Sequence, residues 1–364
     1  YKWVDGSMPK VLRFILSKTG SNAGLVDRLK AVSGILCHGN EIAQELIQTR
    51  CTRGADIARQ LRFSESVADG IHSLDEHWNG LGNPQGLKGA EIPFFSRIAL
   101  LAQVIDLFNQ ADGPEAAVRE AGERSGSWFD PELVIAFRSL SKNPVFWETL
   151  NAPNIDRIVL NLEPAHAEIV LDDAYLDNIA EAFGQVVDAK SPYTAGHSAR
   201  VGLYTALLSE KMALPAERRR WLKRGALLHD LGKLGVSNSI LDKPGKLDEN
   251  EWAAMRSHAA LTGSILGKIS ALKELAEVSS AHHERLDGMG YPLGLSNDQI
   301  CLETRIITTA DIFDAITADR PYRRAVPVEK TLSIMEESVG AALDPVCFNH
   351  LKELVHTSPE FFPT

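Results

Sequence analysis

Residues 216–235 read AERRRWLKRGALLHDLGKLG. Apolar side chains recur in the first part of this segment at spacings of three and four residues, which predicts an amphipathic helix over Ala216–Leu228. The predicted helix ends on an adjacent histidine and aspartate, His229 and Asp230, followed by a glycine-rich turn. Nitrogen and oxygen donors are therefore expected together where the helix gives way to the turn.

The same periodicity recurs over most of the chain, so an all-α fold is predicted. Asp248, followed three residues later by Glu251, is typical of a capping box that opens a helix. The clearest further helical segments are Asp173–Val187, Ser198–Met212 and Thr304–Ile316.

A stretch that contains Pro153 and Pro164 is interpreted as the junction between two halves. Strand-like alternation is scarce, and the best strand candidates are Ile158–Leu162 and Glu168–Leu171 within this stretch. The predicted organisation is a first helical domain over residues 8–150, a linker over 151–172 and a second helical domain over 173–364.

Composition bounds the class of protein. With 364 residues, 44% of them hydrophobic, the chain can bury two cores. A net charge of −10 argues against a nucleic-acid polymer or an anionic membrane surface as the main partner. The absence of a long uncharged apolar run argues against a membrane span. Four separated cysteines without a CxxC motif favour reduced thiols, so a cytoplasmic location is expected.

The chain contains a long internal similarity. The segment NGLGNP at 79–84 matches DGMGYP at 287–292 at an offset of 208 residues (287 minus 79), and the offset continues without gaps. After a short length change, Asp130 corresponds to Asp344. Because the matches extend well beyond the glycines, the two halves are predicted to be copies of one helical unit.

The copies differ at the residues that can bind metal. Under the offset, the first copy has Leu74 for His282, Asp75 for His283 and Gln103 for Asp311. The first copy is therefore expected to be catalytically inactive, with a role in packing, dimerisation or sensing.

Five of the 11 histidines fall between residues 197 and 283. Adjacent pairs such as His229-Asp230 gather several donor atoms at one backbone position, which an apolar core has no reason to tolerate. Imidazole and carboxylate together favour iron, manganese, zinc or nickel over calcium or magnesium. The candidate metal ligands are His197, His229, Asp230, His258, His282, His283 and Asp311.

The motifs around these residues resemble a known family. HDLGK at 229–233 and HHERLDGMGYP at 282–292 resemble the two signatures of the HD-GYP branch of the HD phosphohydrolases. GHSARV at 196–201 and RPYR at 320–323 are further matches. The resemblance implies two tandem HD-type helical bundles, the second an HD-GYP domain and the first a degenerate copy.

The resemblance also implies divalent transition metal ions, most often iron or manganese, and hydrolysis of cyclic dinucleotides. Two cations lower the pKa of a water held between them, which suits attack on a phosphodiester. Asp230 and Lys233 are the expected catalytic residues, with Lys233 stabilising phosphate charge or protonating the leaving sugar oxygen. Asp230 would bridge one site completed by His197, His229 and Asp311 and another completed by His258, His282 and His283.

Three further expectations concern the rim of the site. Arg320 and Arg323 resemble the family's phosphate or base contacts, a task that suits planar guanidinium groups. The motif loop Gly290-Tyr291-Pro292 is expected to shape the backbone beside the site. Members with three metals carry a glutamate where this chain has Tyr193, a poor replacement ligand, so two ions per chain are predicted.

The expected function is cleavage of cyclic di-GMP to linear pGpG or GMP in bacterial second-messenger signalling. One alternative is a phosphodiesterase that prefers 3′3′-cyclic GMP-AMP, and another is a cyclic-dinucleotide sensor or scaffold with little turnover. The intact GYP motif argues against a nucleotide phosphohydrolase of the wider superfamily. Partner hypotheses are a diguanylate cyclase domain and a second copy of the chain.

Overall fold

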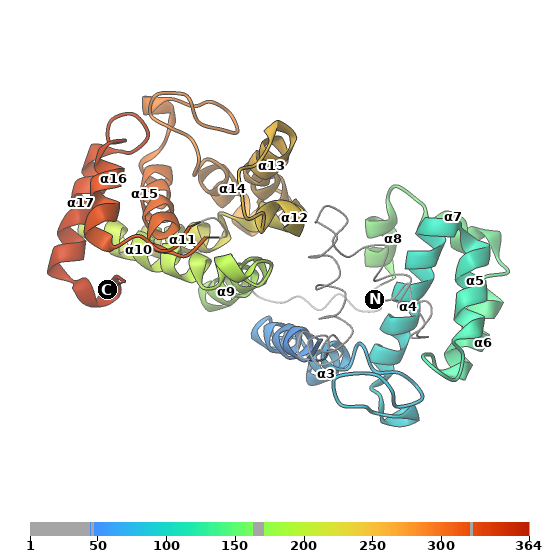
Figure 1. Ribbon diagram of the computed structural model, residues 1–364. Coiled ribbons are helices and arrows are strands. Elements are labelled where there is room, and N and C mark those ends of the chain that lie inside the picture. The colour runs from blue at the N-terminus through green and yellow to red at the C-terminus, as the bar shows by residue number, and fades with distance from the viewer. Residues whose placement is uncertain (1–43, 45–46, 163–170, 321–322, 364) are drawn as a thin grey trace, which may run out of the picture. The chain divides into compact units, whose positions relative to one another are not determined.

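The computed structural model describes residues 44, 47–162, 171–320 and 323–363 (Figure 1). The chain divides into two compact units, residues 1–169 and 170–364. Residues 8–43 of the first predicted domain and 163–170 of the predicted linker lie outside the described ones. Both units are helical, and the described residues contain isolated β-bridges but no β-strand, which confirms the all-α prediction.

The second unit is a helical bundle. Helix α11 has the predicted bounds, because its apolar residues face a core that includes Leu222 and Ala226. In that core Tyr204 meets Phe313 edge to face at a centroid distance of 5.3 Å. The helices are α9 (Asp173–Asp188), α10 (His197–Lys211), α11 (Ala216–Leu228), α12 (Asn238–Leu241), α13 (Glu249–Leu266), α14 (Lys273–Ser280), α15 (Leu302–Thr317), α16 (Val328–Glu336) and α17 (Pro345–Thr357).

The predicted capping box begins α13. The Asp248 carboxylate accepts from the Glu251 N–H at 2.9 Å, and the Glu251 carboxylate accepts from the Asp248 N–H at 2.8 Å. Two N–H groups at the helix start are thereby satisfied. Because this cap fixes where α13 begins, it also fixes the position of His258 along the helix.

The first unit has its own core, built from residues such as Leu100, Val104, Phe129 and Phe137. Residues 47–60 are helical, and α3 (Glu65–His72), α4 (Phe94–Asp112), α5 (Pro114–Glu123), α6 (Pro131–Leu140), α7 (Pro144–Leu150) and α8 (Ile155–Asn161) follow. No helix within the described ranges is long and apolar enough to cross a bilayer.

The strand prediction for Ile158–Leu162 is wrong, because most of this segment belongs to α8. A short apolar run does not by itself distinguish a strand from a helix. With no neighbouring strand in the described chain, a helix satisfies the backbone N–H and C=O groups internally. The partner segment Glu168–Leu171 falls almost entirely outside the described residues.

Equivalent residues of the two units hold equivalent loops. The buried Glu76 carboxylate accepts from the N–H groups of Gln85 at 2.6 Å and Leu87 at 3.0 Å. At the same offset, the buried Glu284 carboxylate accepts from Leu293 at 2.6 Å and Leu295 at 2.9 Å. The β-bridges Asn79 to Lys88 and Asp287 to Ser296 correspond in the same way.

Each unit contains an equivalent arginine–aspartate ion pair. Arg97 pairs with Asp130 at 2.9 Å, and Arg305 pairs with Asp344 at 2.8 Å. These positions correspond through the offset and the short length change found in the sequence. The internal similarity therefore extends from the residue identities to the contacts they make.

Candidate metal centre

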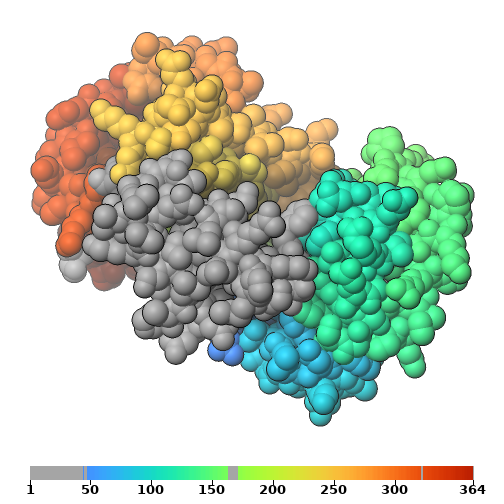
Figure 2. Space-filling model, turned by 45° about the vertical axis from the view of Figure 1, so that its right-hand side comes forward, coloured from blue at the N-terminus to red at the C-terminus, as the bar shows by residue number. Residues whose placement is uncertain are grey.

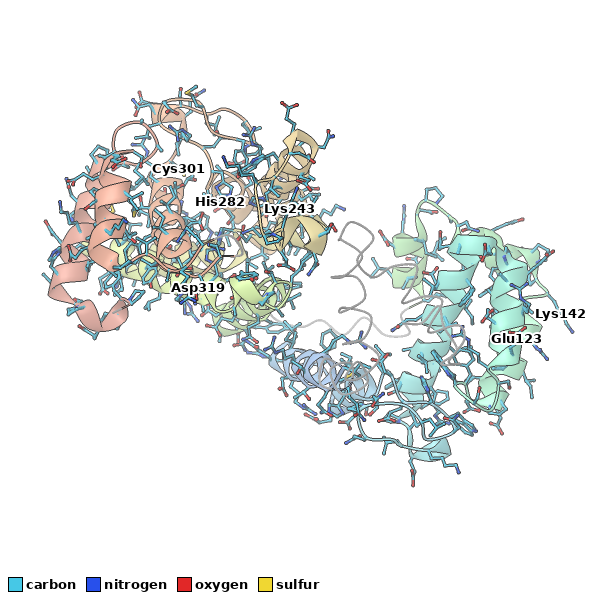
Figure 3. The ribbon with its side chains drawn as sticks, in the orientation of Figure 1. Glu123, Lys142, Lys243, His282, Cys301 and Asp319 are labelled. Carbon is cyan, nitrogen blue, oxygen red and sulfur yellow. The ribbon has the colours of Figure 1, made fainter. Side chains whose placement is uncertain are left out.

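The predicted ligands converge at one place inside the second unit, where Figure 3 labels His282. His197 begins α10, His229 and Asp230 follow α11, His258 lies in α13, His282 and His283 follow α14, and Asp311 lies in α15. Their ligand atoms form three groups, each within 4.8 Å: His258, His282 and His283; His197, His229 and Asp311; and His229, Asp230 and His282.

The Asp230 carboxylate lies between two sets of imidazoles. Its Oδ2 is 3.3 Å from Nε2 of His197 and 3.4 Å from Nε2 of His229. Its Oδ1 is 3.4 Å from Nε2 of His258 and 3.8 Å from Nε2 of His282. Because each oxygen faces a different set, this one carboxylate has the geometry to bridge two neighbouring cations.

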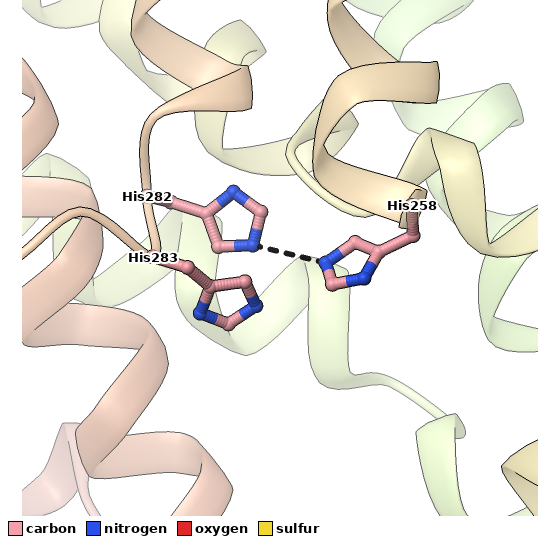
Figure 4. A group of neighbouring side chains, drawn as sticks. All are labelled: His258, His282 and His283. Atoms are coloured by element: carbon pink, nitrogen blue, oxygen red, sulfur yellow. Dashed lines mark hydrogen bonds between the residues drawn. The ribbon is translucent and has the colours of Figure 1, made fainter. Parts of the chain in front are cut away.

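Three imidazoles are oriented by the backbone. In each, Nδ1 lies 2.6 Å from the carbonyl oxygen three residues earlier: His229 on Ala226, His258 on Met255 and His282 on Ser279. A carbonyl only accepts, so Nδ1 carries the proton and the Nε2 lone pair faces the centre. Figure 4 shows His258, His282 and His283 facing one another, with 3.4 Å between Nε2 of His258 and Nε2 of His282.

Unpartnered buried atoms show that this cluster fits a metal ion. Nε2 of His197, Nε2 of His229 and Oδ1 of Asp230 are buried without a hydrogen-bond partner. Buried polar atoms are rarely left unpaired, because their desolvation costs about 1–3 kcal/mol each. A set of nitrogen and oxygen donors aimed at one point suits a divalent transition metal.

The pKa values divide the histidines into two sets. Burial lowers the pKa of His283 to about 3, and burial also lowers the pKa values of His258 and His282. These three imidazoles are therefore neutral at physiological pH and ready to bind a cation.

The other set faces carboxylates. Burial lowers the pKa of His197, but the neighbouring carboxylates of Asp230, Asp311 and Asp314 outweigh it and raise that pKa to about 10. Burial also lowers the pKa of His229, but the carboxylates of Asp230 and Asp311 outweigh it and raise that pKa to about 9. In the metal-free chain protons offset this negative charge, and a bound cation would replace them.

A buried threonine fixes the HD turn to α13. Thr262 Oγ1 donates to the His229 carbonyl at 3.0 Å and accepts from the Gly232 N–H at 2.9 Å. A Cβ on Gly232 would lie 1.9 Å from the His258 carbonyl oxygen, so only glycine permits this approach. The turn that carries Asp230 is thereby held against the helix that carries His258.

Asp314, which was not among the predicted site residues, orients His197. Its Oδ2 lies 2.8 Å from Nδ1 of His197, and Arg200 donates from Nε to Oδ1 at 2.6 Å and from NH2 to Oδ2 at 3.0 Å. Carboxylates of this kind fix the orientation of metal-bound imidazoles and raise their basicity. Asp314 lies one turn after Asp311 on α15, so helix periodicity was the signal that could have found it.

The remaining predicted residues lie at different places. Lys233 donates to Asp230 Oδ2, and so belongs to the centre. Arg323 donates to the carbonyls of Ala315 and Ile316, and Arg320 donates to Ala315 at 3.4 Å. Both guanidinium groups therefore bind the C-terminal end of α15, and their contact with a substrate stays a prediction.

The Gly290-Tyr291-Pro292 loop lies beside the imidazoles. The Tyr291 ring is 4.7 Å from the ring of His283 and 6.4 Å from that of His258, and its N–H donates to the His283 carbonyl at 3.2 Å. A Cβ on Gly290 would lie 2.5 Å from the Arg285 nitrogen, so glycine is required there. The loop borders the centre, as the sequence suggested.

Comparison with known proteins places these motifs in a family. The HD domain family model matches residues 38–133 and 181–346. The chain belongs to the HD domain family. Matches in both units mean that HD domain sequence is not confined to the half that carries the candidate metal centre.

Named relatives of this HD domain chain include two proteins of Vibrio cholerae. It is 58% identical over 360 residues to "3′3′-cGAMP-specific phosphodiesterase 3", covering 99% of this chain and 78% of the relative. It is 34% identical over 326 residues to "3′3′-cGAMP-specific phosphodiesterase 1", covering 86% of this chain and 75% of the relative. A crystal structure of a cyclic GMP-AMP-specific phosphodiesterase from V. cholerae matches with 54% identity and a TM-score of 0.62, covering 98% of this chain and 83% of that one.

A cyclic di-GMP phosphodiesterase of Pseudomonas aeruginosa is 35% identical over 205 residues. This match covers 54% of the HD domain chain and 49% of the relative. This relative therefore matches a smaller share of the chain than the two V. cholerae relatives, which match 99% and 86% of it.

Proposed function

We propose that this chain is a metal-dependent phosphodiesterase that prefers 3′3′-cyclic GMP-AMP. The observation that carries the proposal is the 58% identity, over 99% of the chain, to a V. cholerae protein named for that activity. Cyclic di-GMP, which the motifs alone put first, becomes the alternative substrate. In either case the reaction is hydrolysis of a cyclic dinucleotide.

The proposed centre would hold two divalent transition metal ions, iron or manganese, with Asp230 between their sites. His197, His229 and Asp311 would complete one site, and His258, His282 and His283 would complete the other. The position of Asp230 between two sets of Nε2 atoms supports this division. Ions of this kind, when bound, polarise phosphoryl oxygens and lower the pKa of water.

Lys233 is the proposed proton donor. In hydrolysis the oxygen of water bonds to phosphorus and gives up a proton, the bond from phosphorus to the sugar oxygen breaks, and the sugar oxygen takes up a proton. The Lys233 ammonium contacts Asp230, which keeps it at the centre, and only 16% of its side chain is exposed. It can therefore supply the proton while stabilising phosphate charge.

We further propose that the two units are tandem HD-type bundles, the first without a metal centre. The matching loop contacts of Glu76 and Glu284 support a common architecture. Helix α8 lies inside the predicted linker, and the division between the units at residue 169 also falls there. A homodimer and a diguanylate cyclase partner remain hypotheses for separate tests.

Product chromatography tests the function. Protein purified without oxygen and loaded with Fe²⁺ or Mn²⁺ is given 3′3′-cyclic GMP-AMP or cyclic di-GMP. We expect linear products from both, with the higher kcat/KM for cyclic GMP-AMP. His229→Ala should abolish cleavage, whereas the exposed His356→Ala should not. Metal-loaded protein that leaves both dinucleotides intact would contradict the proposal.

A further inference from the structure

An arginine lies between two aromatic rings at the edge of the metal centre. The Arg256 guanidinium carbon is 5.6 Å from the ring centroid of Trp252 and 5.5 Å from that of Tyr291. Trp252 and Arg256 are four residues apart on α13, so they share one face of the helix. The Tyr291 ring in turn contacts the His283 ring, so a single aromatic ring separates Arg256 from the centre.

The position leaves the hydrogen-bonding groups of Arg256 available. No ion pair within the described chain involves this arginine, which is exposed on α13, the helix drawn in yellow at the surface in Figure 2. Contact with an aromatic ring uses the face of a guanidinium and leaves its N–H groups free in the plane. Those N–H groups form a fork that fits two oxygens of a phosphate.

The first unit provides an internal comparison. At the 208-residue offset, Gln44, Gln48 and Asn83 stand in place of Trp252, Arg256 and Tyr291. Trp252, Arg256 and Tyr291 are therefore all replaced in the first unit. That unit also lacks the imidazoles of the group His258, His282 and His283. Loss of both sets together indicates that they serve one activity and not the packing of the unit.

We propose that Arg256, held by Trp252 and Tyr291, forms a second phosphate subsite beside the metal centre. This inference rests on the proposed function. A cyclic dinucleotide carries two phosphodiesters, and the one that is not cleaved stays anionic in a protein of net charge −10. Arg256 binds that second phosphodiester through its N–H groups and so holds the dinucleotide at the metal centre.

The test compares Arg256→Gln with the wild type, using the whole metal-loaded chain. Glutamine is the residue of the first unit at this position. We expect KM for 3′3′-cyclic GMP-AMP to rise on the order of tenfold, with kcat changed less than about threefold and metal content unchanged. KM should also depend less on salt, because one charge contact is lost. Arg256→Lys, which keeps the charge without the fork, should restore part of the affinity.

Lys268→Gln is the matched control, because it removes one positive charge just beyond the other end of α13. It should leave KM and its salt dependence unchanged. A KM for Arg256→Gln within twofold of the wild type would overturn the subsite, as would a loss of kcat and metal at unchanged KM.

Titration of 3′3′-cyclic GMP-AMP binding separates this inference from the proposed function. Wild type that binds without cleavage overturns the function, yet tenfold weaker binding by Arg256→Gln still supports the subsite. Wild type that cleaves while both proteins bind equally overturns the subsite alone. Wild type that does not bind the dinucleotide overturns both.

Discussion

Arg50 pairs with the carboxylate of Asp75 at the two positions that correspond to His258 and His283. A guanidinium and a carboxylate thus stand where the second unit has two imidazoles of a candidate metal group. The Asp75 side chain is only 3% exposed, whereas that of Arg50 is 62% exposed. The first unit therefore places a cationic side chain where the second unit has neutral ligands.

Arg50→Ala should destabilise the first unit by about 1 kcal/mol, because a buried carboxylate loses a charged partner that is itself largely solvated. Urea unfolding followed by tryptophan fluorescence measures the change. Arg53→Ala, on an exposed neighbouring arginine, is the control. A metal content that falls in Arg50→Ala would argue against a metal-free first unit.

Asp314→Asn should weaken metal binding about 10- to 100-fold, because the partner that orients His197 loses its charge. Competition with a chelator measures the affinity. Asp298→Asn, an exposed aspartate of the same unit, should leave it unchanged. Equal affinities in all three proteins would show that Asp314 does not position His197.

Gly232→Ala should displace the turn from α13 and cost more than about 3 kcal/mol, because the added Cβ meets backbone atoms that cannot move away. The midpoint temperature of thermal unfolding and the metal content should both fall. Gly245→Ala is the matched control, since nothing lies within 4 Å of its Cβ. Wild-type behaviour of Gly232→Ala would contradict the close approach.

Metal analysis of protein purified without oxygen should find two ions per chain. Tyr193, at the position of a third-site glutamate, lies in a short 3-10 helix four residues before His197. Dialysis against a chelator should abolish cleavage, and Mn²⁺ or Fe²⁺ should restore it. Three tightly bound ions would contradict the prediction.

Asp344 should contribute to stability above its unfolded pKa. Burial raises this pKa, but Arg305 and the N–H groups of Val346 and Cys347 outweigh it and hold it below the ordinary 3.8. The contribution is therefore complete near pH 7 and is lost as pH falls through the folded pKa. Urea unfolding should show Asp344→Asn less stable than wild type at pH 7, with the difference shrinking below pH 3.8. A difference independent of pH would show that the carboxylate charge is not involved.

Helix periodicity predicted much of the second unit. The bounds of α11 are those expected, and α9 ends one residue later than predicted. The strand prediction at Ile158–Leu162 was wrong because a short apolar run carries no information about a pairing partner.

The ligands were predictable because adjacent donor pairs are visible in the sequence. The roles of Thr262 and Arg256 were not predictable. Their contacts form only when α13 packs against the HD turn and the Tyr291 loop. Likewise, the binding of Arg323 to the end of α15 depends on how the following segment folds back.

The carboxylate of Glu76 holds its loop in a unit that lacks the imidazoles present in the other. The shape of this loop therefore does not depend on those imidazoles, because backbone N–H groups that donate to one carboxylate hold it in place. A duplicated unit of this kind can lose its chemistry one substitution at a time while remaining folded. The retained shape is then free to acquire a different task.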